Sequence, residues 1–350
     1  MKQLYVTLFP YIIGCCGGIV FNALNIPLPW ILGPMIFLIT LRSILSKQPK
    51  YVQPLLFKNI SLSILGISFG LSFNKDTFLT VAPYVVPFLI ATIVLISFSI
   101  INGVMISKFV KIDRNTSIFA SIPGGLTEMV TASESLNANT SLVTIFQTVR
   151  LLTVVFFVPF TILHMFEPQQ GGTLIDTITN NASFFSFGWY ILAGLTGYLF
   201  KSFLPASYVI GPLLTTAMLN IIGISLPSFS NIVLVFAQLT IGISFGLMIT
   251  FKDLKIGGKY CGLYFLTTLL LIGASFGIGY LFTLITDLDT GTAMLSFAPG
   301  GLVEMVLTAS SIGADPAVVS SLQFIRLLFI ISVLPSLLKF GLKKITYERI

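Results

Sequence analysis

The stretch SIPGGLTEMV at residues 121–130 returns as FAPGGLVEMV at residues 297–306. Both copies place Pro-Gly-Gly and a glutamate, Glu128 or Glu304, inside segments that are otherwise apolar. Proline interrupts a helix, and glycine permits backbone angles and close approaches that other residues do not. Each copy therefore predicts a sharp turn within an apolar part of the fold.

The two copies belong to a longer internal repeat. Residues 124–152 and 300–328 align without gaps and are identical at 13 of 29 positions. Self-similarity of this kind indicates that one structural unit has been duplicated. Further repeats are GISFGL at 66–71 and 242–247, and ILGP at 31–34 with VIGP at 209–212. The identical pairs include Glu128 with Glu304, Gln147 with Gln323 and Arg150 with Arg326.

The composition places the whole chain in a membrane. Hydrophobic residues make up 55% of the sequence, charged residues 9%, and the mean hydropathy is +0.99. Apolar runs recur along the chain, and a run of about 18 or more residues spans the ~30 Å hydrocarbon core at ~1.5 Å per residue. A β-barrel would instead show short segments that alternate apolar and polar residues. We therefore predict an all-α polytopic membrane protein.

The duplication divides the chain into a first repeat at 1–165, a polar linker at 166–182 and a second repeat at 183–350. Each repeat is predicted to hold five transmembrane helices, with one Pro-Gly-Gly segment between the fourth and the fifth. The predicted helices lie at 4–24, 28–46, 57–74, 79–110 and 140–163, and at 184–203, 206–224, 231–250, 257–286 and 317–340.

Loop charge predicts that the second repeat is inverted, because basic loops favour the cytoplasmic side. The loops after the second and fourth helices are basic in the first repeat, whereas their counterparts are uncharged or carry Asp287 and Asp289. Both termini are then cytoplasmic and the linker is external. Five crossings per repeat produce this inversion and six do not, so the segments 115–137 and 291–313 are predicted to be re-entrant hairpins. Full crossing is the alternative. The basic residues of these two loops in the first repeat are Arg42, Lys47, Lys50, Lys58, Lys108, Lys111 and Arg114.

A hairpin that turns near the bilayer midplane presents the free N–H groups of a new helix there, which suits an anion. Ionisable groups at that depth are rare and usually face a cavity or a partner. We therefore predict Glu128 and Glu304 as ion-coupling residues. The alternative is that they only form ion pairs with the two arginines. The predicted substrate-binding residues are Gly124, Gly125, Gly300, Gly301, Gln147, Gln323, Arg150 and Arg326.

Other chemistries find little support in the sequence. Cys15, Cys16 and Cys261 lie in apolar runs, and His164 is the single histidine. Zinc and copper centres usually need several such ligands, so we expect no metal and no cofactor. No P-loop and no DNA-reading module is recognisable, so we expect neither an enzyme nor direct nucleic-acid binding.

The PGGLxEM segments at 123–129 and 299–305, the GISFGL repeat and the ILGP element resemble the bacterial AbrB-type membrane proteins over the whole chain. That family carries the labels of regulators of gene expression or ammonia monooxygenases. The second label would require copper ligands that one histidine does not supply. More distantly, the chain is similar to the superfamily of cation/proton antiporters and anion transporters. Its symporters for glutamate and citrate contain inverted repeats with Gly-Gly hairpins.

The expected function is secondary transport of a small anionic organic solute across the bacterial cytoplasmic (plasma) membrane, coupled to H⁺ or Na⁺ through the midplane glutamates. The alternatives are a membrane regulatory protein that acts indirectly on gene expression and a cation/proton antiporter. The expected partners are a small-molecule or ion substrate and the lipid bilayer. The sequence leaves open a homodimer, the identity of the substrate and the direction of transport.

Overall fold

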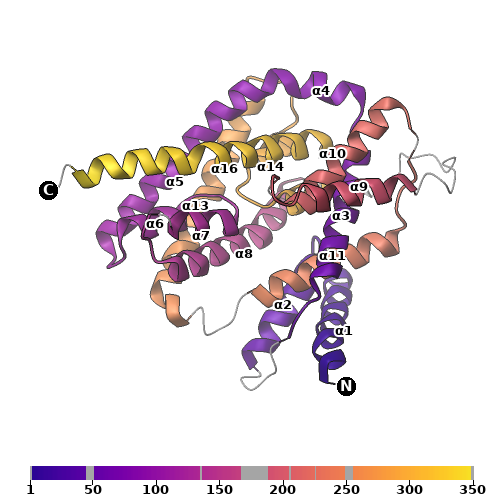
Figure 1. Ribbon diagram of the computed structural model, residues 1–350, viewed down its shortest axis with the longest axis horizontal. Helices are drawn as coiled ribbons and strands as arrows, with labels where there is room; N and C mark the ends of the chain where they lie inside the picture. Colours follow the sequence, from indigo (N-terminus) through magenta and orange to yellow (C-terminus); the bar gives the residue numbers. More distant parts are fainter. Residues whose placement is uncertain are drawn as a thin grey trace.

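The helices follow one another in the same order in both halves of the chain (Figure 1). The computed structural model describes residues 2–44, 51–134, 136–166, 188–204, 206–224, 226–248 and 255–347, and it contains no strand in these ranges. The predicted linker, apart from Phe166, lies outside the described residues. The first half holds α1 (Lys2–Ala23), α2 (Pro29–Ile44), α3 (Leu55–Leu71), α4 (Lys75–Val81), the 3₁₀-helix η1 (Ala82–Tyr84), α5 (Val85–Phe109), α6 (Arg114–Ser121), α7 (Leu126–Glu134) and α8 (Thr140–Met165). The second half holds α9 (Gly188–Leu199), α10 (Ser207–Ile222), α11 (Asn231–Met248), α13 (Lys259–Thr283), α14 (Thr290–Phe297), α15 (Leu302–Ile312) and α16 (Pro316–Tyr347).

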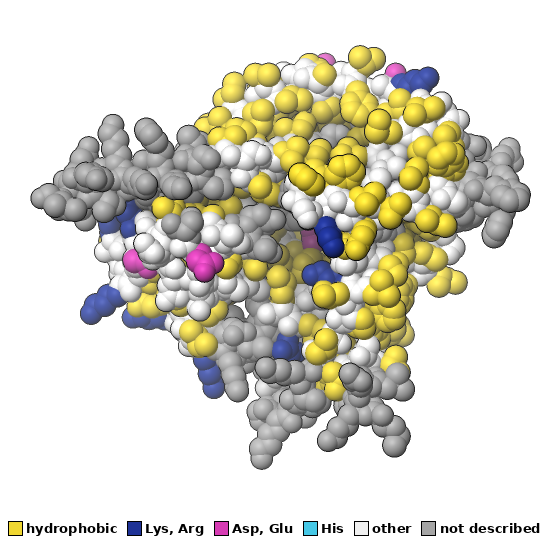
Figure 2. Space-filling model, in the orientation of Figure 1, with side chains coloured by type: hydrophobic (Ala, Val, Ile, Leu, Met, Phe, Trp, Pro, Cys, Tyr) yellow, Lys and Arg dark blue, Asp and Glu magenta, His cyan; other side chains and the backbone are white. Residues whose placement is uncertain are grey.

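The predicted all-helical class is confirmed for the described residues, and six helical stretches have the length and composition to cross a membrane. Large apolar side chains are exposed on the outside, as a bilayer contact requires. Figure 2 shows apolar side chains over the upper part of one face, where α4 and α10 lie. Leu79 of α4 and Ile222 of α10 are more than two-thirds exposed. The six stretches are Val6–Ala23, Lys75–Phe109, Thr140–Met165, Asn231–Met248, Lys259–Thr283 and Pro316–Val333.

Each predicted helix has a helical counterpart, but α2, α3, α9 and α10 have 16, 17, 12 and 16 residues, so ten full membrane spans are not confirmed. Local chemistry explains one of the differences in the bounds. The predicted helix 79–110 begins earlier, at Lys75, because the Asn74 side chain accepts a hydrogen bond from the Thr77 N–H in a capping box. The same helix narrows to the short 3₁₀ turn η1 around Pro83, since proline has no N–H to donate.

Both Pro-Gly-Gly sites interrupt the helical backbone. Helix α6 ends at Ser121 and α7 starts at Leu126, and α14 ends at Phe297 before α15 starts at Leu302. We call residues 122–125 the first break and residues 298–301 the second break. Each broken pair packs against the helix before it and the helix after it: α6 contacts α5 and α8, and α14 contacts α13 and α16.

The GISFGL repeats hold the two halves together. A Cβ built on Gly66 in α3 would lie 2.3 Å from the carbonyl oxygen of Val209 in α10. In the other half, a Cβ on Gly242 in α11 would lie 2.4 Å from the carbonyl oxygen of Ile31 in α2. Glycine therefore lets these backbones touch, as small residues do between membrane helices. The ILGP and VIGP elements are the surfaces that GISFGL contacts.

Two side chains at matching positions cap the ends of the GISFGL helices. Arg42 of α2 donates to the carbonyl oxygens of Gly246 and Leu247, the latter at 2.8 Å. Asn220 of α10 donates to those of Leu71 and Phe73, the latter at 2.6 Å. The carbonyls at a helix C-terminus have no partner within the helix, so both side chains satisfy otherwise unpaired groups.

Candidate functional site

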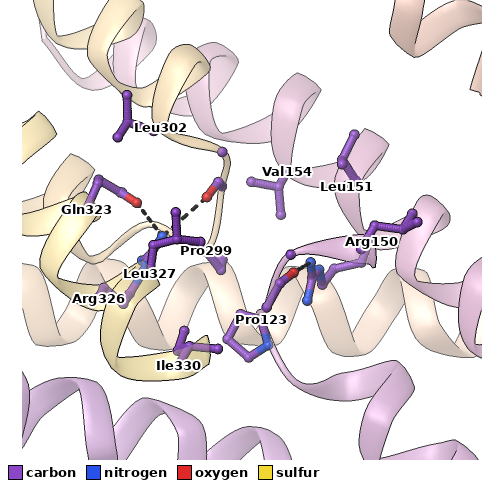
Figure 3. Close-up of a pocket in the computed structure, with 15 residues that line it drawn as sticks. Pro123, Arg150, Leu151, Val154, Pro299, Leu302, Gln323, Arg326, Leu327 and Ile330 are labelled. Atoms are coloured by element: carbon purple, nitrogen blue, oxygen red, sulfur yellow. Dashed lines mark hydrogen bonds between the residues drawn. The ribbon is translucent and has the colours of Figure 1, made fainter. Parts of the chain in front are cut away.

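The two breaks line one cavity of about 130 Å³ (Figure 3). Pro123, Gly124 and Gly125 of the first break meet their counterparts of the second break there. Helix α8 contributes Arg150, and α16 contributes Arg326. Four segments, two from each half, therefore converge on the site. The remaining lining residues are Leu126, Leu151, Val154, Pro299, Gly300, Gly301, Leu302, Gln323, Leu327 and Ile330.

Two helix N-termini meet at this cavity. Leu126 and Leu302 are the first residues of α7 and α15, and both line it. The first N–H groups of a helix have no acceptor within it and carry the positive end of the helix dipole. Gly301, the N-cap of α15, supplies no side chain to cap them. The arrangement offers backbone donors to a negatively charged group.

The arginines secure the breaks. Arg150 donates through Nη1 to the carbonyl oxygen of Ile122 and through Nη2 to that of Gly124, the latter at 2.8 Å. Arg326 donates through Nη1 to Phe297 at 3.1 Å and Ala298 at 2.7 Å, and through Nη2 to Gly300 at 3.2 Å. These carbonyls follow the ends of α6 and α14, where the helix ladder stops.

The glutamines three residues earlier bind the same stretches of backbone. Gln147 donates through Nε2 to the carbonyl oxygens of Phe119 and Ile122, and Gln323 donates to those of Leu295 and Ala298. Gln323 also accepts a hydrogen bond from Arg326. Gln323 lines the cavity and Gln147 does not. Their roles in substrate binding stay predictions.

Glu304 lies in the first turn of α15, 3% exposed, and its Oε2 has no hydrogen-bond partner. The carboxylate folds back over Gly301, because a Cβ built on that glycine would lie 2.3 Å from Oε2. The hydrogen bonds of Arg326 go to backbone carbonyls and to Gln323. The alternative of a structural Glu304–Arg326 ion pair is therefore wrong. The side chain of Glu128 lies outside the described residues, so its role stays a prediction.

A family comparison agrees with the motifs around this cavity. The family model described as transition state regulatory protein AbrB matches residues 30–341, a span that contains both breaks. The chain belongs to the AbrB family. It is 25% identical to protein YhjN of Bacillus subtilis (strain 168) over 92% of this chain and 90% of that protein. It is also 25% identical to a protein of Escherichia coli (strain K12) named as an AbrB regulator, over 91% of this chain and 92% of that protein.

Sequence reasoning missed two methionines of this AbrB-family chain. A Cβ built on Gly124 would lie 2.7 Å from Met129 Cε, and one on Gly300 would lie 2.5 Å from Met305 Cε. Both methionines are fully buried. The sequence signal was that both PGGLxEM copies contain this methionine. In the structure the methionine lies one turn into the new helix and packs against the first glycine of the break.

The aliphatic part of the cavity was also missed. Leu151 and Val154 lie one and four residues after Arg150, and Leu327 and Ile330 stand in the same relation to Arg326. The spacing of four residues puts Val154 and Ile330 on the same helix face as the arginine, which was readable from the sequence. The spacing of one residue does not do so for Leu151 and Leu327, and the structure was needed to place them in the lining. Among the described residues, no group of three His, Cys, Asp or Glu side chains could hold a metal ion.

Proposed function

We propose that this AbrB-family protein is a secondary transporter that carries a small organic anion across the bacterial cytoplasmic membrane. One observation carries the proposal: two helix breaks from the two halves of a duplicated chain line a single cavity. Inverted-repeat transporters bind their substrates near the midplane at the interface of the repeats, where broken helices point their N-termini at anionic groups.

The chemistry of the lining favours an anion. Among the side chains that the structure describes, Arg150 and Arg326 are the charged residues of the lining, and no carboxylate lines the cavity. The N-termini of α7 and α15 add two positive dipole ends. Because Glu304 lies behind Gly301, its carboxylate would be a neighbour of a bound anion rather than its direct contact.

We propose that the two halves have inverted orientations and that the broken pairs are re-entrant. Helices α6, α7, α14 and α15 have 8, 9, 8 and 11 residues, so each extends about 12–17 Å at ~1.5 Å per residue, roughly half of the ~30 Å core. This supports breaks near the midplane. The exchange of Arg42 for Asn220 at equivalent caps supports opposite orientations, since basic residues favour the cytoplasmic side.

Coupling to H⁺ or Na⁺ is proposed to pass through Glu304 and Glu128. The buried Glu304 Oε2 without a partner is a group that a proton or a cation can satisfy. A cation/proton antiporter would use the same carboxylate and is the second candidate for transport. The regulator name of the Escherichia coli relative is compatible with an indirect effect, in which the transported solute alters gene expression.

Transport is tested with purified protein reconstituted in liposomes. We expect uptake of small carboxylates driven by a pH or Na⁺ gradient, and loss of coupled uptake in Glu304→Gln and Glu128→Gln with folded protein retained. Gly277→Ala is the matched control, because a Cβ there has no neighbour within 4 Å. Normal coupled transport by both glutamine variants would reduce the glutamates to a structural role.

Orientation is tested with single cysteines at Lys111 and Asp287, equivalent exposed positions before the two broken pairs, in a background without Cys15, Cys16 and Cys261. Membrane-impermeant maleimide should label the first from the cytoplasmic side and the second from the outside. Labelling of both from one side would contradict the inverted arrangement.

A further inference from the structure

We propose that the cavity between the two breaks binds a monocarboxylate with a short aliphatic tail, in preference to di- and tricarboxylates. This inference rests on the proposed function, because it names the class of anion that the same site takes. It follows from the hydrogen bonds that the two arginines have already made and from the side chains that line the rest of the cavity.

The first observation is that Arg326 has almost no donors left. A guanidinium group carries five N–H donors. Arg326 uses four of them, three on the carbonyl oxygens of Phe297, Ala298 and Gly300 and one on the side chain of Gln323. One N–H, on Nε, remains. Bidentate binding of a carboxylate needs two parallel N–H groups, so Arg326 contributes charge but not a second carboxylate clamp.

Arg150 is different. It uses two of its five donors, on Ile122 and Gly124. Its Nε is buried without a partner, and so is Oε1 of the neighbouring Gln147. The equivalent oxygen in the other half, Oε1 of Gln323, accepts from Arg326. The lining therefore contains one arginine with spare donors, which matches one carboxylate.

The amide of Gln323, which also lines the cavity, is already bonded to Leu295, Ala298 and Arg326. The N-terminus of α15 already has the Glu304 carboxylate folded over Gly301, which leaves the N-terminus of α7 beside Arg150.

The rest of the cavity is aliphatic. Among the described residues, six side chains on all four segments supply the aliphatic surface, and none of the six carries a hydrogen-bonding group for a second carboxylate. A carboxylate placed against this surface would lose its hydration without gaining a partner. A methylene group placed there gains about 0.8 kcal/mol, which is about a fourfold increase in affinity. The six are Leu126, Leu151, Val154, Leu302, Leu327 and Ile330.

The volume limits the length of the tail. The cavity of about 130 Å³ is smaller than the ~300 Å³ at which pockets for drug-sized ligands begin. A ligand with a few carbon atoms fits this space, and a long-chain fatty acid does not.

The test measures binding of acetate, butyrate, isovalerate, succinate and citrate to the purified full-length protein by titration calorimetry and by ligand-dependent thermal shift. We expect affinity to rise about fourfold per added CH₂ from acetate to butyrate. Succinate, similar in length to butyrate, should bind at least tenfold more weakly, because its second carboxylate meets the aliphatic wall.

Two valines in α8 provide a matched pair of variants. Val154 lines the cavity, whereas Val158 lies one turn further along and is equally buried without lining it. Val154→Thr should weaken butyrate binding several-fold and leave acetate nearly unchanged. Val158→Thr should cost similar stability and leave the preference for butyrate over acetate intact. This control distinguishes an effect of the cavity lining on binding from a general loss of stability. Loss of that preference in Val158→Thr would contradict the proposal that the aliphatic side chains of the cavity bind the tail of the ligand.

The outcomes separate the inference from the proposed function. Succinate or citrate binding as tightly as butyrate, or acetate binding as tightly as butyrate, would overturn the monocarboxylate assignment and leave an anion transporter in place. Stabilisation by cations alone, with no response to any carboxylate, would overturn both.

Discussion

The two broken helices share a scaffold. Asp113 and Asp289 cap the N-termini of α6 and α14, accepting from the N–H groups of Thr116 and Thr292 at 2.8 and 3.1 Å. Each break is then held by a glutamine and an arginine from the helix that follows. The duplication has thus kept in both halves the contacts that hold a non-helical backbone inside an apolar fold, where unpaired carbonyls are costly.

Their surroundings differ. Tyr264 of α13 donates its hydroxyl to Ser117 of α6 at 3.0 Å, beside a small polar cavity. The equivalent of Tyr264 in the other half is Phe88, which packs against Phe297 of α14 with ring centroids 4.7 Å apart. The first broken pair therefore has a polar neighbour, and the second has an aromatic one. The polar cavity is lined by Ser99, Asn102, Ala120, Ser121, Tyr264, Thr267, Thr268 and Leu271.

The contacts from the following helix that hold the broken backbone are therefore shared by the two halves, whereas the neighbours of α6 and α14 on α13 and α5 differ. In the proposed inverted arrangement, the polar neighbour of α6 and the aromatic neighbour of α14 lie toward opposite sides of the membrane. Substitutions at equivalent positions in the two halves test which of these contacts are shared and which differ.

Removal of an arginine should produce the largest difference in stability loss between the two halves. Arg326→Met removes a donor from three backbone carbonyls and from Gln323, although Ala298 keeps its bond from Gln323. Arg150→Met removes a donor from two carbonyls, of which Ile122 keeps its bond from Gln147. We expect Arg326→Met to cost about 3–5 kcal/mol of unfolding free energy and Arg150→Met about half as much. Unfolding in mixed micelles measures both, with Arg326→Lys and Arg150→Lys as partial rescues. Equal losses would show that the additional bonds of Arg326 add no stability.

Substitution of the two glycines that pack against α6 and α14 should instead cost similar stability in both halves. A Cβ on Gly103 would lie 2.8 Å from Ile118 Cα, and one on Gly279 would lie 2.7 Å from Met294 Cα. We expect Gly103→Ala and Gly279→Ala each to cost about 2–3 kcal/mol by overpacking. Gly273→Ala, where a Cβ meets nothing within 4 Å, is the control and should cost nothing. A large difference between the first two variants in the same unfolding assay would show that the scaffold is not shared.

Replacement of Phe88 by the tyrosine of the other half should lower the stability of the protein. Phe88→Tyr places a hydroxyl in a fully buried apolar cluster around Phe297, where the equivalent of Ser117 is Ala293. We expect a loss of about 1–2 kcal/mol, because the hydroxyl finds no partner. The double variant Phe88→Tyr with Ala293→Ser, which rebuilds the polar pair of the other half, should recover part of it. If the double variant recovers no stability, the surroundings of the two broken pairs differ by more than this pair of residues.

The reverse exchange should have the smallest effect. Tyr264→Phe removes one hydrogen bond to Ser117, while Ser117 keeps its own bond to the carbonyl oxygen of Gly103 at 2.7 Å. We expect a cost of about 1 kcal/mol. A double-mutant cycle with Ser117→Ala measures the coupling, and a coupling near zero would show that the polar neighbour does not hold α6.

Local signals predicted the elements of this fold well. Pro123 and Pro299 stop the helices because proline lacks an N–H, and continuous apolar runs predict spanning helices wherever they fall in the chain. The duplication could be detected in the sequence because identical residues recur at a constant spacing. The bounds shifted where a cap such as Asn74 decided the first turn, a contact that a hydropathy pattern does not contain.

Residues that are neighbours along the chain specify the helical class, the positions of the two breaks and the polar residues that accompany them, so these features can be read without a structure. Only the folded molecule shows that Arg326 binds the carbonyls of the second break instead of Glu304, and that both breaks line one cavity. It also shows that Gly66 meets Val209 and Gly242 meets Ile31. These contacts join residues from about thirty to two hundred positions apart, and they form because buried backbone carbonyls must find donors and glycine surfaces allow helices to touch.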